Sequence, residues 1–88
     1  PFAVETDKGV VLITEQKNDA DRLFMIENIG NLKDELFNGA LPIKVKFSLP
    51  EGKKTFYFKG KETVVKQSDG QYGVELKVGD AVFIEIKQ

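Results

Sequence analysis

The sequence contains no cysteine and no histidine, and these two absences exclude more chemistry than any residue present. Without thiols the chain can form neither a disulfide framework nor a thiolate metal site. Without imidazole it has no Ser-His or Cys-His nucleophile, no histidine zinc ligand and no side chain whose unperturbed pKa lies near neutrality. Most hydrolytic chemistry is therefore closed to these residues. We predict a non-catalytic protein that carries no cofactor.

An excess of one charge and long apolar runs are also lacking. The 13 basic and 14 acidic residues are interspersed along the chain, and the formal net charge is −1. This balance does not build the broad positive field that a phosphate backbone requires, so we predict no nucleic-acid partner. No apolar run reaches the roughly 18 residues of a membrane-spanning helix, and no signal-peptide pattern opens the chain. We predict no membrane partner, while bacterial cytoplasm, periplasm and secretion all stay compatible with the sequence.

The length and composition fit one globular domain, predicted to span residues 1–88. Hydrophobic residues make up 41% of the chain and charged residues 31%, proportions typical of a chain that folds. Because the sequence begins at Pro1 rather than at methionine, we expect either a processed product or, as the interpretation we adopt, a piece excised from a larger protein.

The apolar periodicity is that of β-strands. Residues 43–49 alternate most clearly, with Lys44, Lys46 and Ser48 between the apolar positions. Residues 22–28 are apolar on both strand faces, which predicts a central, covered strand. The other predicted strands are residues 2–5, 10–14, 55–59, 62–67, 72–77 and 81–87. Turn signals at spacings of roughly 8 to 12 residues predict an all-β fold of about eight short strands, either a small antiparallel β-sandwich or a partly closed barrel.

Turn-forming residues separate these strands. Residues 6–9 predict a hairpin between the first two strands, and Gly70, after Asp69, suits a second hairpin. We expect Gly79 to provide the backbone freedom of a tight corner and Asp80 to hydrogen-bond within it. Residues 31–39 are the one helical candidate. They form either one or two helical turns near residues 32–37 or an irregular loop fixed by its apolar side chains.

Candidate sugar-binding residues are few, because such surfaces normally stack exposed aromatic rings on the apolar face of a sugar. Tryptophan is absent, which leaves Tyr57 and Tyr72 as the candidates with a polar group. Tyr57 is out of phase with both neighbouring phenylalanines, so it lies on the opposite face of its strand. Packing of that face against a neighbouring domain is the simpler interpretation.

The charged residues likewise favour structural roles. Glu27 ends an apolar strand, where burial would raise the pKa of its carboxyl, but a hydrogen bond to loop backbone beside Asn28 explains it more simply. Residues 18–21 and 68–70 could offer oxygen ligands to calcium, yet the Asp-x-Asp-x-Asp-Gly pattern is missing, so we predict no metal site. Lysines on sheet faces and edges commonly protect a sheet from pairing with another. The lysine-rich middle of the chain consists of Lys44, Lys46, Lys53, Lys54, Lys59, Lys61 and Lys66.

The order of these features resembles a known family. Residues 21–28, DRLFMIEN, look like the apolar strand followed by Asn that opens the small β-sandwich domains at the C-terminus of many glycoside hydrolases. Residues 70–86, GQYGVELKVGDAVFIEI, are similar to the closing pattern of that family, Gly-x-Tyr-x-Val-x-Leu, then Pro-Gly-Asp-Ala and a final apolar strand. Val78 stands here in place of the usual proline. Residues 55–62 fit the same scheme, so the resemblance covers roughly residues 21–87.

The resemblance implies a β-sandwich that packs against a catalytic (β/α) barrel of the same polypeptide and stabilises it. The catalytic acids of such enzymes lie in the barrel, so it implies no catalytic residue here. Two other functions fit the sequence. One is a carbohydrate-binding module that uses Tyr57 or Tyr72, with carbohydrate as its partner. The other is an interaction domain of a cell-envelope protein.

Overall fold

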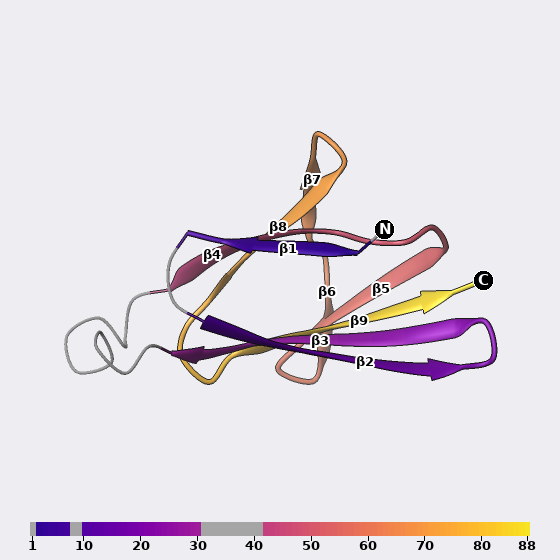
Figure 1. Cartoon of the computed structure of the whole chain (residues 1–88), viewed down its shortest axis with the longest axis horizontal. Coiled ribbons are helices and arrows are strands. Elements are labelled where there is room, and N and C mark those ends of the chain that lie inside the picture. The colour runs from indigo at the N-terminus through magenta and orange to yellow at the C-terminus, as the bar shows by residue number, and fades with distance from the viewer. Residues whose placement is uncertain (1, 8–9, 31–41) are drawn as a thin grey trace.

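The computed structural model describes residues 2–7, 10–30 and 42–88, and these residues form two antiparallel sheets packed face to face (Figure 1). Sheet A has the strand order β1-β4-β8-β7 and sheet B the order β2-β3-β9-β5-β6. Sheet A is the upper layer in Figure 1 and sheet B the lower. The strands within the described ranges are β1 (Ala3–Thr6), β2 (Val10–Asn18), β3 (Asp21–Gly30), β4 (Ile43–Ser48), β5 (Lys53–Phe58), β6 (Lys61–Thr63), β7 (Lys66–Ser68), β8 (Gln71–Leu76) and β9 (Ala81–Lys87). The predicted small β-sandwich is confirmed.

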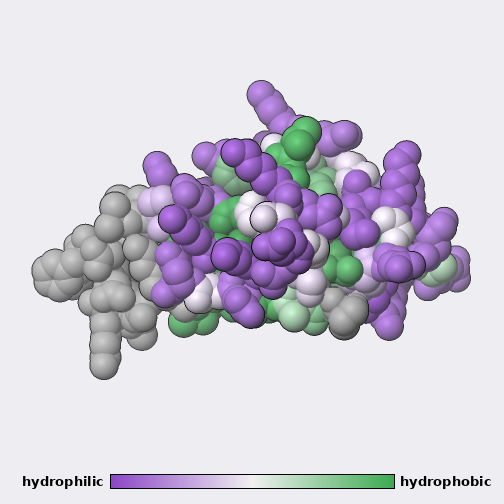
Figure 2. Space-filling view, turned by 90° about the horizontal axis from the view of Figure 1, so that it is seen from above, coloured by the Kyte–Doolittle hydropathy of each residue, from purple (hydrophilic) through white to green (hydrophobic). Residues whose placement is uncertain are grey.

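The core lies between the sheets and follows from the alternation of the strands. In β4, Val45 and Phe47 are fully buried while Lys44 and Lys46 face solvent. Seen from above, the molecule presents a mostly hydrophilic surface (Figure 2). Complete burial of one large aliphatic or aromatic side chain contributes about 1.5 to 3 kcal/mol to stability. The buried hydrophobic cluster consists of Phe24, Ile26, Ile43, Val45, Phe47, Phe56, Leu76, Val82, Ile84 and Ile86.

Strand β3 is central in sheet B, between β2 and β9, as the apolar sequence predicts. Only one of its faces is covered by the described residues, however. Phe24 and Ile26 are buried in the core, whereas Leu23 and Ile29 on the other face are exposed. Within the described residues the second face is not covered as predicted, because a two-layer sandwich covers only the inner face of each sheet.

The predicted hairpin between residues 2–5 and 10–14 is also wrong. Strand β1 pairs with β4 in sheet A, and β2 pairs with β3 in sheet B. The Lys44 N–H donates to Asp7 Oδ1 (2.9 Å), and the Asp7 N–H donates to the Lys44 carbonyl (3.1 Å). These two bonds hold the end of β1 against β4, so the chain changes sheets after Asp7. Turn residues predict a change of direction but not which strand is the next partner.

The predicted strand at residues 62–67 is two strands in the structure. Strand β6 ends in sheet B and β7 begins in sheet A, with Val64 between them 95% exposed. A tight turn then joins β7 to β8, with Asp69 at φ 53° and Gly70 at φ 77°. Two successive positive φ values are the geometry of a two-residue hairpin turn. The helical or loop alternatives for residues 32–37 lie outside the described residues.

Candidate functional site

One buried polar side chain joins the two sheets near the end of β3. Asn28 is 1% exposed; its Nδ2 donates to the Leu76 carbonyl (2.9 Å), and its Oδ1 accepts from the Gly30 N–H (2.8 Å). Its main chain is also paired, because the Asn28 N–H donates to the Asp80 carbonyl (3.0 Å) and the Gly79 N–H donates to the Asn28 carbonyl (2.9 Å). A buried amide stabilises a fold only when its polar groups are paired, as they are here. Asn28 therefore fastens sheet B to the end of β8 in sheet A.

The corner after β8 carries the chain from sheet A to sheet B. Gly79 has φ 89°, in the left-handed region that favours glycine. Asp80 Oδ2 accepts from the Lys77 N–H (3.1 Å), and the Asp80 N–H donates to the Lys77 carbonyl (2.9 Å). These bonds lie within the corner itself, so Gly79 and Asp80 have a geometric role. The sequence alone does not identify Asn28 as the partner of this corner, although Asn28 lies two residues after Ile26 and so shares its buried strand face.

The two candidate tyrosines point in different directions, one into the sandwich and one outward from sheet B. Tyr72 points inward from β8, where its ring centroid lies 5.8 Å from that of Phe47 and 5.1 Å from that of Phe56. Tyr57 lies on the outer face of sheet B, directly opposite Phe83 of β9. The structure therefore does not bring the tyrosines together into one platform for stacking a sugar.

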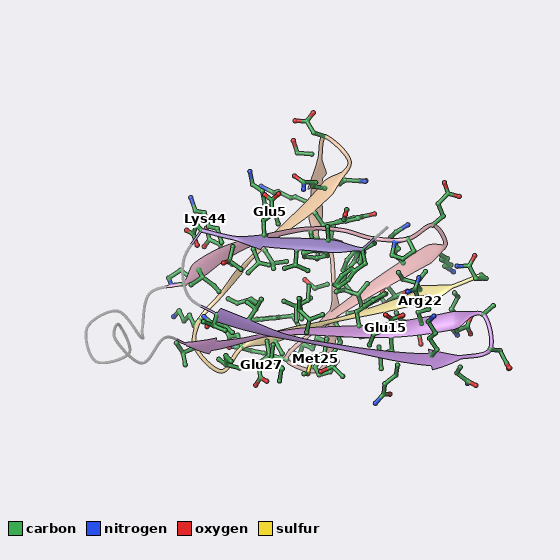
Figure 3. The ribbon with its side chains drawn as sticks, viewed as in Figure 1. Glu5, Glu15, Arg22, Met25, Glu27 and Lys44 are labelled. Carbon is green, nitrogen blue, oxygen red and sulfur yellow. The ribbon has the colours of Figure 1, made fainter. Side chains whose placement is uncertain are left out.

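The outer face of sheet B carries a row of apolar side chains across its strands. Tyr57 pairs with Phe83, and Phe83 pairs with Met25 of β3. Figure 3 shows Met25 and Glu27 pointing away from sheet A, on the underside of sheet B. Phe83 is 39% exposed and Leu12 of β2 is 47% exposed. We call this surface the outer apolar face, and its residues are Leu12, Leu23, Met25, Ile29, Tyr57 and Phe83.

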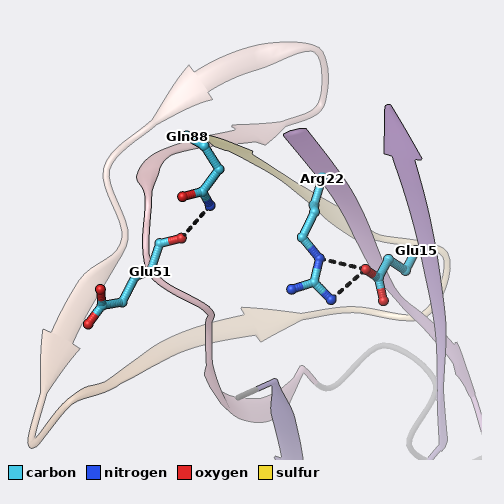
Figure 4. A network of polar contacts seen from close by, with 4 residues as sticks. All are labelled: Glu15, Arg22, Glu51 and Gln88. Carbon is cyan, nitrogen blue, oxygen red and sulfur yellow. Dashed lines mark hydrogen bonds and ion pairs between the residues drawn. The ribbon is translucent and has the colours of Figure 1, made fainter. Parts of the chain in front are cut away.

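Two polar contacts lie near one end of the sandwich: one joins Arg22 and Glu15, and in the other Gln88 Nε2 donates to the Glu51 carbonyl at 2.8 Å (Figure 4). Arg22 donates through Nε to Glu15 Oε2 at 2.7 Å and forms an ion pair with the same oxygen. The guanidinium also lies 5.2 Å from the centre of the Phe24 ring, which stacks on Phe2. Both charged side chains are partly exposed, so the pair stabilises the fold by about 1 kcal/mol at most. Its position over the ring of Phe24 indicates that Arg22 covers the end of the core.

Acidic side chains do not gather into a metal site in the described part of the chain, since no group of three or more His, Cys, Asp or Glu residues is placed to hold an ion there. The same residues contain no helix long and apolar enough to cross a membrane. Neither a protein-family model, nor a curated protein, nor a solved structure matches the chain.

Proposed function

We propose that this chain is a non-catalytic accessory domain of a bacterial glycoside hydrolase, which packs against the catalytic domain of the same polypeptide and stabilises it. The outer apolar face is the observation that carries the docking part of the proposal, and the resemblance of residues 21–28 and 70–86 suggests the kind of parent enzyme. Exposed apolar side chains scattered singly are ordinary, whereas a contiguous group of them is typical of a surface that contacts a partner. On this face the aromatic pair Tyr57 and Phe83 adjoins Met25 on the neighbouring strand.

The energetic gain from docking comes from the area still exposed in the isolated domain. Phe83 and Leu12 are each less than half exposed, so docking would recover only part of the about 1.5 to 3 kcal/mol that full burial provides. The contributions of several such side chains add up over the face. Acidic Glu27 and Glu85 lie among them on the same face, so the proposed docking surface of the catalytic domain carries basic or hydrogen-bonding groups opposite these two positions.

The test uses the polypeptide that contains both domains, with Leu23→Ser and Phe83→Ser introduced together. Calorimetry is expected to show a lower unfolding temperature for the catalytic domain. Lys44→Ser with Lys46→Ser, on the outer face of sheet A, is the matched control and should leave that temperature unchanged. The double substitution on sheet B is also placed in this domain alone, to check that the domain still folds. If the variant domain folds on its own but the unfolding temperature of the catalytic domain does not change, the proposal is contradicted.

A carbohydrate-binding role is the second candidate, and the pair Tyr57 and Phe83 favours it. The two rings lie opposite each other on a solvent-facing sheet surface, where the apolar face of a sugar could stack. NMR titration with neutral oligosaccharides tests this function. Saturating shifts at Tyr57 and Phe83 would support it, and the absence of shifts at both would remove it. Glycosidase turnover by the chain itself would contradict the non-catalytic accessory role.

A further inference from the structure

A groove crosses the outer face of sheet A, on the side of the molecule opposite the outer apolar face. It measures about 410 Å³ and lies over strands β4, β7 and β8. The hairpin of β7 and β8 rises away from the rest of sheet A (Figure 1). We call it the Gly73 groove, because Gly73 of β8 lies in the middle of its lining. Docking through sheet B would leave it open to solvent.

Neither the backbone conformation nor a lack of space requires glycine at position 73. Its φ is not positive, and a Cβ built on it would meet no atom within 4 Å. A glycine inside a strand weakens the strand by roughly 0.5 kcal/mol or more in general, and commonly marks a place where a ligand approaches the backbone closely. The missing side chain here leaves an open notch in the floor of the groove.

Two lysines flank that notch in register. Lys46 of β4 and Lys66 of β7 are both paired with Gly73, one on each side. Two strand spacings separate them, roughly 10 Å, a span that flexible lysine side chains can close around one anionic group. Among residues 2–7, 10–30 and 42–88, the ion pair found is Arg22–Glu15, and neither Lys46 nor Lys66 forms one. Both ammonium groups can therefore bind a ligand.

Two acidic residues line the groove, Asp69 and Glu75, and a third, Glu5, lies beside it. Asp69 is in the hairpin turn, Glu75 is paired with Lys44, and Glu5 of β1 lies on the far side of Lys46. These acids offset most of the charge of the lining lysines Lys44, Lys46 and Lys66, so the positive field of the groove is small and local. The groove therefore suits one compact anionic group and not a polyanion such as nucleic acid.

The remaining lining supplies neutral hydrogen-bonding groups. Gln71 shares the outward side of β8 with Gly73, and Ser68 is paired with Gln71 across the hairpin. The aromatic residue of the lining, Tyr72, turns its ring toward Phe47 and Phe56 inside the sandwich. The groove thus presents lysine ammonium groups and neutral groups that can hydrogen-bond to hydroxyls, but no aromatic ring on which a sugar could stack. We propose that it binds a sugar acid, with the carboxylate between Lys46 and Lys66 and hydroxyls toward Gln71 and Ser68.

The test is a titration of the chain with trigalacturonate, followed by amide NMR. We expect saturating shifts centred on Gly73, Lys46 and Lys66 that weaken with added salt. Lys46→Gln with Lys66→Gln should weaken binding at least about tenfold, because a charge-assisted hydrogen bond is lost on each side of the carboxylate. Lys53→Gln with Lys61→Gln removes the same charge from sheet B and should leave the affinity unchanged. Gly73→Val should also abolish binding, by filling the notch.

Two further probes separate the sugar acid from simpler ligands. A neutral trisaccharide should give no shift at Gly73, and sodium sulfate should bind more weakly than trigalacturonate. The proposal is overturned by equal shifts from the neutral sugar, by sulfate binding as tightly as the sugar acid, or by no shift at Gly73. Equal weakening by the lysine pair on sheet B would also overturn it, since binding would then depend on net charge alone.

Discussion

At the residue scale, three glycines differ in what prevents a side chain at their positions. Gly52 has φ 137°, and a Cβ there would lie 2.5 Å from Cγ2 of the fully buried Ile86. Gly79 has φ 89° but open space around it, so only its backbone conformation favours glycine. Gly73 has neither restriction. The same substitution at the three sites therefore separates steric overlap, backbone strain and the absence of both.

We predict that the loss of stability on substitution by alanine follows the order Gly52, Gly79, Gly73. Gly52→Ala adds overlap with Ile86 to a strained backbone, and we expect a loss of about 2 to 4 kcal/mol. Gly79→Ala should cost about 1 to 2 kcal/mol from strain alone. Gly73→Ala should be neutral or slightly stabilising. Urea unfolding at constant pH measures all three, and equal losses at Gly52 and Gly73 would contradict the steric argument.

Substitution of Asn28 is a second test, of how much its hydrogen bonds contribute to stability. Asn28→Ala leaves the Leu76 carbonyl and the Gly30 N–H without their partner in a buried place, which should cost about 2 to 4 kcal/mol. Asn18→Ala, at an exposed position of β2, is the matched control and should change stability by less than about 0.5 kcal/mol. Urea unfolding of the two variants gives the comparison. Similar stability of both would mean that Asn28 does not fasten the sheets.

At the scale of elements, the sequence predicts strands better than it predicts their partners. The alternation of β4 and β9 is local, and their buried residues follow from it directly. The partners of β1 and β2 depend on residues far along the chain, such as Asp7 and Lys44, so a local turn signal cannot assign them. The same limit applies to the candidate site. The alternation of side chains along β5 places Tyr57 on the opposite strand face from Phe56. Only the pairing of β5 with β9 brings Tyr57 next to Phe83.

Strand position also predicts how local stability is distributed. Strand β9 is paired on both sides and carries three fully or almost fully buried side chains, whereas the short strand β7 is paired only with β8 and is exposed throughout. Amides of β3 and β9 should therefore exchange with solvent deuterium most slowly, and those of β7 much faster. Exchange followed by NMR gives the order. Protection of β7 equal to that of β9 would contradict this distribution.

At the scale of the whole molecule, the two outer faces of the sandwich differ in chemistry. Sheet A presents lysines around a groove, while sheet B presents apolar side chains with acids among them. The overall charge of −1 hides this separation, because the basic and acidic residues nearly cancel. An accessory domain with one docking face and one open face fits this arrangement. We propose that the catalytic domain covers the outer apolar face.

Thiol labelling tests that claim most directly, because the natural chain has no cysteine. Phe83→Cys and, as a control on sheet A, Lys44→Cys are prepared in this domain alone and in the polypeptide that includes the catalytic domain. Maleimide labelling of each site is followed by peptide mass spectrometry. We predict that the thiol introduced in place of Phe83 reacts at least about tenfold more slowly in the two-domain polypeptide, because burial limits access. The rate at the Lys44 site should not change. Equal labelling rates at the Phe83 site in both proteins would contradict it.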